Sequence, residues 1–273
     1  KIELLDYNLL SSLRVKISNG HIYNMNDFIL FIPKTRKNDN EIFLSSLFWQ
    51  LNFLSPRTFY TNLSFYGLEK KVIFQESPNK YFLQSHSRKN GPILAGNRIR
   101  IWGNEIYNQA ALSRIKNYGG LDFGLEEHRQ IILKSMSKLN ESLLILRNHI
   151  NIKKDLHKLP IILLEDSKNV NFVYPYLSNL YLNDKIGYKN MSAFEALMIA
   201  TGSTAGLSSE DRRYYYDAVN DRFEPIYYDG MSRILDEEFN LFTELGVEYN
   251  LTNSKYLFDG ATHAIDILSN IIL

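Results

Sequence analysis

The sequence predicts a mixed α+β fold in two parts, a small sheet with one helix followed by a larger, mainly helical region. Strand-like apolar and aromatic runs gather in the first third of the chain. Segments with apolar residues at helical spacing dominate the second half. A polar stretch with several glycines, over 84–104, separates the strand-rich region from the helix-rich region. We therefore divide the chain into 1–83, a loop or linker region at 84–104, and 105–273.

The first part is predicted to run strand, helix, strand, strand. Residues 28–33 form a continuous apolar run that ends in proline, which is typical of a buried strand. Apolar residues then recur at helical spacing over about 40–53. Residues 58–65 and 71–76 are β-rich and are separated by a short glycine-containing turn, so they predict a hairpin.

The second part is predicted to be helical with one embedded β-hairpin. The runs Tyr214–Tyr216 and Phe223–Tyr228 are aromatic and flank a turn rich in Asp and Asn, which is the composition of a hairpin. The helices that we expect in this part lie over 105–117, 125–149, 193–201, 230–245 and 260–272.

Composition excludes several classes of function. The net charge of +1 gives no basic footprint for nucleic acid. The absence of cysteine excludes disulfides, cysteine nucleophiles and cysteine-bound zinc. No run of apolar residues is long enough for a transmembrane helix. Neither a P-loop nor the glycine pattern of a dinucleotide-binding fold is present.

Two carboxylates mark the ends of the predicted hairpin. Asp211 precedes its first strand and Asp229 follows its second, with Gly230 next in the chain. A hairpin brings its ends together, so we expect the two carboxylates to face one small volume and to bind Mg²⁺ with phosphate oxygens. Turn chemistry alone also explains Asp and Gly at strand ends, and this alternative stays open.

Basic residues follow the first predicted strand. Lys34 lies at the end of the strand and Glu41 in the first turn of the next helix, the order in which kinases place a phosphate-binding lysine and the carboxylate that orients it. Arg36 and Arg57 are alternative phosphate ligands. A solvated strand end and helix start would show the same pattern.

Several short stretches together resemble the CotH-like spore-coat family of atypical protein kinases. They are the run from Lys34 into the helix, the strand that closes on Phe74-Gln-Glu76, and the segment from Glu210-Asp211 to Tyr228-Asp229-Gly230. The resemblance covers about 28–232 and implies a two-lobed kinase-like architecture that uses ATP and Mg²⁺. It implies nucleotide-binding roles for Lys34, Arg36, Glu41 and Glu76, metal binding by Asp229 and Asp211, and a catalytic role for Asp211.

The sequence also departs from the family pattern. Asp211 stands where the family usually has Asn, and Gly202–Ser209 contains no carboxylate although the resemblance would place a catalytic Asp there. Two functions therefore remain open: Mg²⁺-dependent phosphoryl transfer from a nucleotide to a protein or glycan hydroxyl, or an inactive kinase-like scaffold in cell-surface or coat assembly. A third option is a carbohydrate-binding protein that uses exposed tyrosines.

These interpretations lead to a specific expectation for the site. We expect a cleft between the two parts, lined by Lys34, Glu76 and Asp229. We also expect the ammonium group of Lys34 within about 4 Å of Glu41 or another carboxylate, because an unpaired buried charge is costly.

Overall fold

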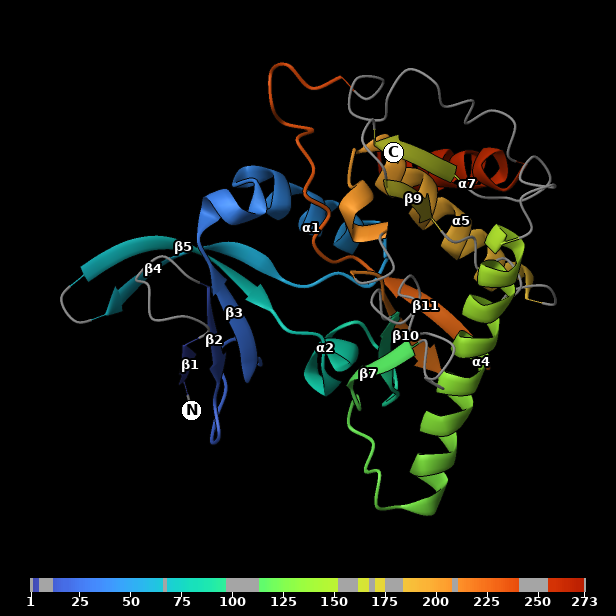
Figure 1. The fold of residues 1–273 in the computed structure, drawn as a ribbon. Helices are drawn as coiled ribbons and strands as arrows, with labels where there is room; N and C mark the ends of the chain where they lie inside the picture. Colours follow the sequence, from blue (N-terminus) through green and yellow to red (C-terminus); the bar gives the residue numbers. More distant parts are fainter. Residues whose placement is uncertain are drawn as a thin grey trace.

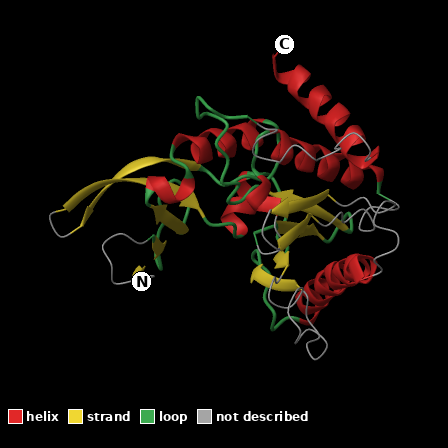
Figure 2. Ribbon diagram, turned by 45° about the horizontal axis from the view of Figure 1, so that its top comes forward, coloured by secondary structure: helices red, strands yellow, loops and turns green. Residues whose placement is uncertain are grey.

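The computed structural model describes a mixed α+β fold built on antiparallel sheets (Figures 1 and 2). The described residues are 2–4, 12–65, 68–96, 113–151, 162–166, 170–174, 184–207, 211–240 and 255–272. None of the helices in these ranges is long and apolar enough to cross a membrane.

The first sheet has five antiparallel strands in the order β1-β2-β3-β5-β4. Its strands are β1 (Ile2–Leu4), β2 (Leu13–Lys16), β3 (Asp27–Phe31), β4 (Thr58–Phe65) and β5 (Leu68–Glu76). The predicted β4–β5 hairpin is confirmed. This sheet has a small core of its own, in which the ring of Phe74 stacks on Phe28 at 4.2 Å and on Phe59 at 4.8 Å.

A short turn and a helix connect β3 to β4. The 3₁₀ helix η1 (Pro33–Arg36) follows β3, and helix α1 (Asp39–Gln50) follows η1, close to the helix predicted over 40–53. Lys37 and Asn38 lie between them, both with positive φ, of 56° and 53°, and Lys37 is in the left-handed conformation, so the chain direction reverses sharply. Residues 33–36 thus leave the sheet and enter α1 within one tight turn.

The second sheet contains the predicted 211–229 hairpin, which is confirmed, and two strands that were not predicted. Its order is β11-β10-β6-β7, with all neighbours antiparallel. The strands are β6 (Ile93–Gly96), β7 (Ser113–Asn117), β10 (Arg213–Asp217) and β11 (Arg222–Ile226), and a short helix, α2 (Lys80–Ser85), precedes β6. The prediction of a loop at 84–104 is therefore wrong at β6, and that of a helix at 105–117 is wrong at β7. Pairing with neighbouring strands decides the conformation of both segments.

The long helices agree with the periodicity of the sequence. They are α4 (Glu126–Asn151), α5 (Lys185–Ala200) and α7 (Lys255–Ile272). Helix α5 begins well before the predicted 193–201, because the carboxylate of Asp184 caps it by accepting from the backbone N–H groups of Ile186 and Gly187. The remaining described elements are β8 (Ile162–Asp166) paired with β9 (Val170–Tyr174), and the 3₁₀ helix η5 (Thr204–Leu207).

The prediction of a helix over 230–245 is wrong for its described part, which ends at residue 240. This segment consists of turns and extended chain. Asp229 and Met231 have φ of 48° and 56°, which are incompatible with a right-handed helix start. The hydroxyl of Ser232 donates to the carbonyl of Thr201, which holds the segment beside the end of α5. The remainder of the predicted helix lies outside the described residues.

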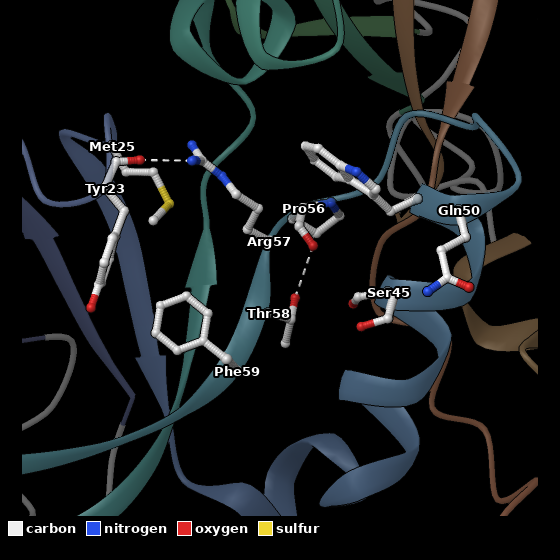
Figure 3. Close-up of a pocket in the computed structure, with 10 residues that line it drawn as sticks. Tyr23, Met25, Ser45, Gln50, Pro56, Arg57, Thr58 and Phe59 are labelled. Atoms are coloured by element: carbon white, nitrogen blue, oxygen red, sulfur yellow. Dashed lines mark hydrogen bonds between the residues drawn. The ribbon is translucent and has the colours of Figure 1, made fainter.

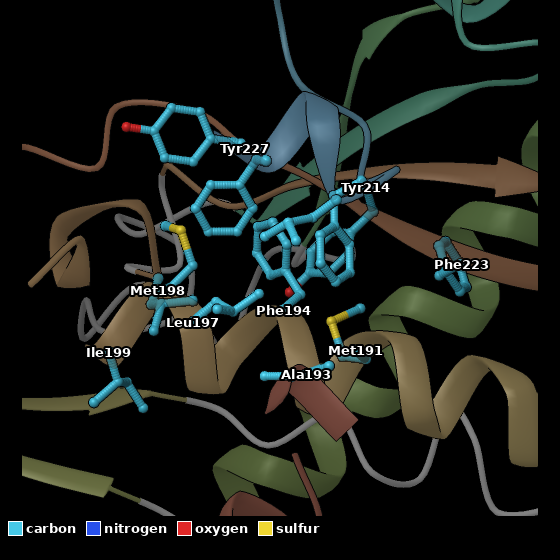
Figure 4. Close-up of a cluster of buried hydrophobic side chains, with 14 of the residues drawn as sticks. Met191, Ala193, Phe194, Leu197, Met198, Ile199, Tyr214, Phe223 and Tyr227 are labelled. Carbon is cyan, nitrogen blue, oxygen red and sulfur yellow. The ribbon is translucent and has the colours of Figure 1, made fainter. Parts of the chain in front are cut away.

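The main hydrophobic core joins α1 to α5, α7 and the hairpin strands (Figure 4). The fully buried ring of Phe48, on α1, stacks on Tyr227 at 4.9 Å and meets Phe194 of α5 edge-on at 5.2 Å. A buried ion pair between Arg212 and Glu195, at 2.9 Å, ties the start of β10 to α5. The helix that the sequence assigns to the first part thus packs largely on the second.

Candidate functional site

The chain beyond β11 runs along the segments that connect the two sheets. Leu54 forms a parallel bridge with Ile226, and the Tyr227 N–H donates to the Leu54 carbonyl at 2.8 Å. Tyr227, Tyr228 and Asp229 therefore lie beside η1 and α1. This brings the end of the predicted hairpin to the basic and acidic residues that follow the first predicted strand.

Arg36 and Asp229 form an ion pair at this junction. Both side chains are largely shielded, with exposed fractions of 11% and 20%. The Arg36 guanidinium also lies 4.0 Å from the centroid of the Phe31 ring and 5.7 Å from that of Tyr228. Burial is the largest single influence and disfavours its charge, but the hydrogen bond and charge of Asp229, with the nearby Tyr228 and Glu41, together raise the pKa of Arg36.

Glu41 is a buried carboxyl group next to this pair. One of its oxygens accepts from Gln75 Nε2 at 2.7 Å and the other from the Tyr227 hydroxyl at 3.0 Å. Burial raises the pKa of Glu41 to about 7, although the Gln75 hydrogen bond and the charge of Arg36 act in the opposite direction. Near neutral pH this carboxyl group is therefore balanced between its two protonation states.

Further basic residues approach the same place from the second sheet. The Arg213 guanidinium lies 4.4 Å from the centroid of the Tyr228 ring, so Tyr228 contacts an arginine from each part of the chain. Asp211 interacts electrostatically with Arg213 and with Lys116. Partial burial, then Arg213 and Arg114, lower the pKa of Lys116 to about 8.

We refer to these residues together as the charge cluster. Its members are Arg36, Arg114, Lys116, Asp211, Arg213, Tyr228 and Asp229. Basic groups outnumber carboxylates in it, although the net charge of the whole chain is only +1. The Arg114 Nε atom is buried without a hydrogen-bond partner in the described part of the chain. A local excess of positive charge with unused donors suits a polyanionic ligand.

A polar pocket of about 400 Å³ lies between strands of the first sheet and the segment that follows β7. One side comes from β2 and β3 with residues such as Lys16 and Asp27, and the other from Asn117, which directly follows Lys116, and from Gly120. Asn79 and Tyr81, in the connection from β5 to β6, also line it.

The structure brings some of the predicted site residues together and separates others from them. Arg36, Glu41 and Asp229 come together, whereas Lys34 is exposed on η1 and the expected Lys34–Glu41 pair is not formed. The tight turn of η1 explains this, because it points Lys34 outward and Arg36 inward. Glu76 lies elsewhere, in a two-bond ion pair with Arg57 at 2.9 and 2.7 Å.

The structure gives Asp211 and Asp229 different basic neighbours. Asp229 pairs with Arg36, and Asp211 interacts with Arg213 and Lys116. The described residues contain no group of three or more His, Cys, Asp or Glu side chains arranged for a metal ion. Side chains alone therefore provide no preformed metal site within the described residues.

Four members of the charge cluster were not predicted from the sequence. Arg114 and Lys116 were missed because their segment, which forms β7, was predicted to be a helix. Arg213 had a usable signal, since a charged residue inside a buried aromatic strand usually has a specific partner. Tyr228 had no usable signal in the sequence beyond its place next to Asp229.

Comparison with known proteins gives no further support for an assignment. No protein-family model matches the chain, and no curated protein matches it at a significant level. The functional argument therefore depends on the geometry of the charge cluster.

Proposed function

We propose that the charge cluster binds the phosphates of ATP and that the protein transfers a phosphoryl group to a hydroxyl of a protein or glycan. The observation that supports this most is the convergence of Arg36, Glu41 and Asp229. Kinase-type sites combine a cation for the phosphates, a helix carboxylate beside it and a metal-binding carboxylate. Here these three types come from η1, the first turn of α1 and the end of the hairpin, with Arg36 in place of the lysine.

The basic side chains would carry the phosphates. Guanidinium groups match phosphate oxygens with paired hydrogen bonds, and Arg36 and Arg213 both lie against Tyr228. Lys116 adds a third cation from β7. The polar pocket between the sheets would hold the base, with the side-chain nitrogen of Asn117 as a donor, since the oxygen of that amide already accepts from the Gly119 N–H. In this proposal the first sheet and the rest of the chain act as the two lobes of a kinase-like architecture.

Mg²⁺ would enter with the nucleotide. This ion usually keeps several waters and binds through one or two carboxylates together with phosphate oxygens, so Asp229, supported by Asp211, fits it without a three-carboxylate cage. Asp211 would also accept the proton of the attacking hydroxyl. Arg36 would exchange its bond to Asp229 for bonds to phosphate.

The alternative is an inactive kinase-like scaffold, and one observation favours it. Both carboxylates already have basic partners, and the described residues 202–207 include no carboxylate in the position where the family resemblance calls for a catalytic Asp. A scaffold needs neither nucleotide nor phosphoryl transfer.

Calorimetric titration with ATP, with and without Mg²⁺, tests the proposal. We expect the wild type to bind ATP more tightly with Mg²⁺, Asp229→Asn to lose this Mg²⁺ dependence, and Arg36→Met to weaken binding about tenfold or more. Arg129→Met is the matched control, because Arg129 forms only a surface ion pair with Glu126 within α4.

Thermal unfolding of all variants separates loss of binding from loss of fold. Transfer of labelled phosphate to protein and glycan acceptors then distinguishes an enzyme from a nucleotide-binding scaffold. Failure of the wild type to bind ATP at millimolar Mg²⁺ would contradict the proposal and favour the inactive scaffold instead.

A further inference from the structure

A second pocket, none of whose lining residues belongs to the charge cluster, lies between helix α1 and the start of strand β4. Its volume is about 670 Å³ (Figure 3). Tyr23 and Phe59 form one wall, and Ser45 and Gln50 on α1 face them across the space, with Arg57 above. The two rings meet edge-on at a centroid distance of 5.9 Å, and Tyr23 is 72% exposed. An aromatic surface is therefore open to a ligand at the mouth.

The pocket is electrically neutral. Of the ten residues that line it, Arg57 alone carries a charge. Its guanidinium forms two bonds to the Glu76 carboxylate and donates through Nη1 to the carbonyl of Tyr23 at 2.7 Å. The positive charge is thus matched, and most of the donor capacity is used. This disfavours an anion as the occupant.

Hydroxyl and amide groups provide the polar side of the pocket. Ser45 is 1% exposed, and its Oγ has no hydrogen-bond partner among the described residues. The Thr58 hydroxyl donates to the Pro56 carbonyl at 3.1 Å and accepts from Gln75 at 3.3 Å. Ser46 and Gln50 complete this side. An unpartnered buried hydroxyl is costly, which disfavours a purely hydrocarbon occupant.

We propose that this pocket binds a neutral sugar ring of a glycan. A pyranose has an apolar C–H face that can lie on Tyr23 and Phe59, and it has hydroxyls that both donate and accept. Ser, Thr and Gln side chains also do both, so they match sugar hydroxyls without a fixed pattern of donors and acceptors. The combination of a neutral charge, an aromatic wall and several hydroxyls on the opposite side favours this class of ligand over anions and lipids.

This inference is independent of the phosphoryl-transfer proposal. None of the residues that line the pocket belongs to the charge cluster. The binding test therefore runs without nucleotide or Mg²⁺, and its outcome leaves the proposed reaction untouched.

Saturation-transfer NMR on the whole chain tests the proposal. The probes are the methyl glycosides of glucose, galactose, mannose and N-acetylglucosamine, with indole as an apolar aromatic comparison. We expect saturable binding of at least one glycoside. Tyr23→Asn and Thr58→Val should each weaken it about tenfold. Asn is chosen because Tyr23 has φ of 50°, which Asn tolerates, and Val keeps the shape of Thr while removing its hydroxyl.

The control is Tyr118→Asn, which removes another exposed tyrosine outside the pocket. It should leave glycoside binding unchanged, and thermal unfolding should show all three variants folded. Glycoside binding that survives both pocket variants, or is lost equally in the control, would overturn the proposal. So would binding of indole alone, or no binding of any glycoside at millimolar concentration.

Discussion

Folding changes the ionisation of the Glu41 carboxyl group most clearly near neutral pH. Glu41 is 2% exposed, and burial raises its pKa from 4.5 to about 7. The folded state therefore holds the proton more tightly than the unfolded chain. The resulting stability is fully present below about pH 4.5 and is lost as the pH rises through about 7.

Replacing Glu41 by Gln should remove this pH dependence. Gln can still accept from Gln75, and its amide can donate to the Tyr227 hydroxyl, so the fold should persist. Relative to the wild type, the variant should gain up to roughly 3 kcal/mol of unfolding free energy between pH 4.5 and pH 8. Urea unfolding at several pH values measures the difference. A constant difference across this range would contradict a raised pKa at Glu41.

At the level of single residues, the sequence predicted which basic and acidic residues gather at the site better than it predicted which of them pair with each other. Lys34 and Arg36 are both basic, and only the tight turn of η1 decides that Arg36 faces Asp229 while Lys34 is exposed. Glu41 was identified through its place in the first turn of a helix, and Asp229 through its place at the end of a hairpin. These signals are local, whereas the partner of each residue depends on the tertiary fold.

Among the elements, the junction before β6 and after β7 is unusually close-packed. Gly119 has φ of 61°, and a Cβ atom there would lie only 1.8 Å from the Gly91 carbonyl oxygen. The Gly91 N–H donates to the Gly119 carbonyl at 3.2 Å. Both glycines let two backbone segments touch beside the pocket between the sheets, which a side chain would prevent.

Gly119→Ala should therefore destabilise the protein by about 2 kcal/mol or more, from backbone strain together with steric overlap. Gly20→Ala is the matched control, since Gly20 has φ of 97° but no atom within 4 Å of the added Cβ. It should cost only about 1 kcal/mol, the strain alone. Chemical denaturation compares the two. Equal effects would show that the contact with Gly91 is not rigid.

Elements with strong local periodicity were predictable. Both hairpins and the helices around 40–53, 125–149 and 260–272 are confirmed. Strands β6 and β7 were missed, because each is short and is held by neighbours distant in the sequence. The segment after Asp229 was also mispredicted, since its left-handed residues and its contacts with α5 and α1 outweigh helix propensity.

At the scale of the whole molecule, hydrogen bonds at the N-terminus of α1 connect the first part of the chain to the segment after the hairpin. The buried side chain of Asn40 donates to the Lys37 carbonyl at 3.1 Å and to Asp236 Oδ1 at 3.0 Å. Its oxygen accepts from the Leu235 N–H at 2.7 Å. One amide group thus joins positions almost 200 residues apart.

Asn40→Ala should break this connection and cost roughly 1–3 kcal/mol, because buried polar groups lose their partners. Hydrogen exchange at the Leu235 amide should accelerate, while exchange in the β10–β11 hairpin stays slow. Asn220→Ala is the control. Asn220 is exposed and bonds only within its own turn, to Asp217, so its loss should leave Leu235 unchanged. Unaltered exchange at Leu235 in Asn40→Ala would argue against this role.

The amide of Gln75 would connect the two proposed ligand sites. Its nitrogen donates both to Glu41, beside the charge cluster, and to Thr58, in the wall of the proposed sugar pocket. An occupant that draws the Thr58 hydroxyl toward itself would alter the partner of Gln75 and hence the environment of Glu41. Thermodynamic linkage makes such an effect reciprocal, so nucleotide would change sugar affinity by the same factor. The protein would then respond to the coincidence of two signals rather than to either one alone.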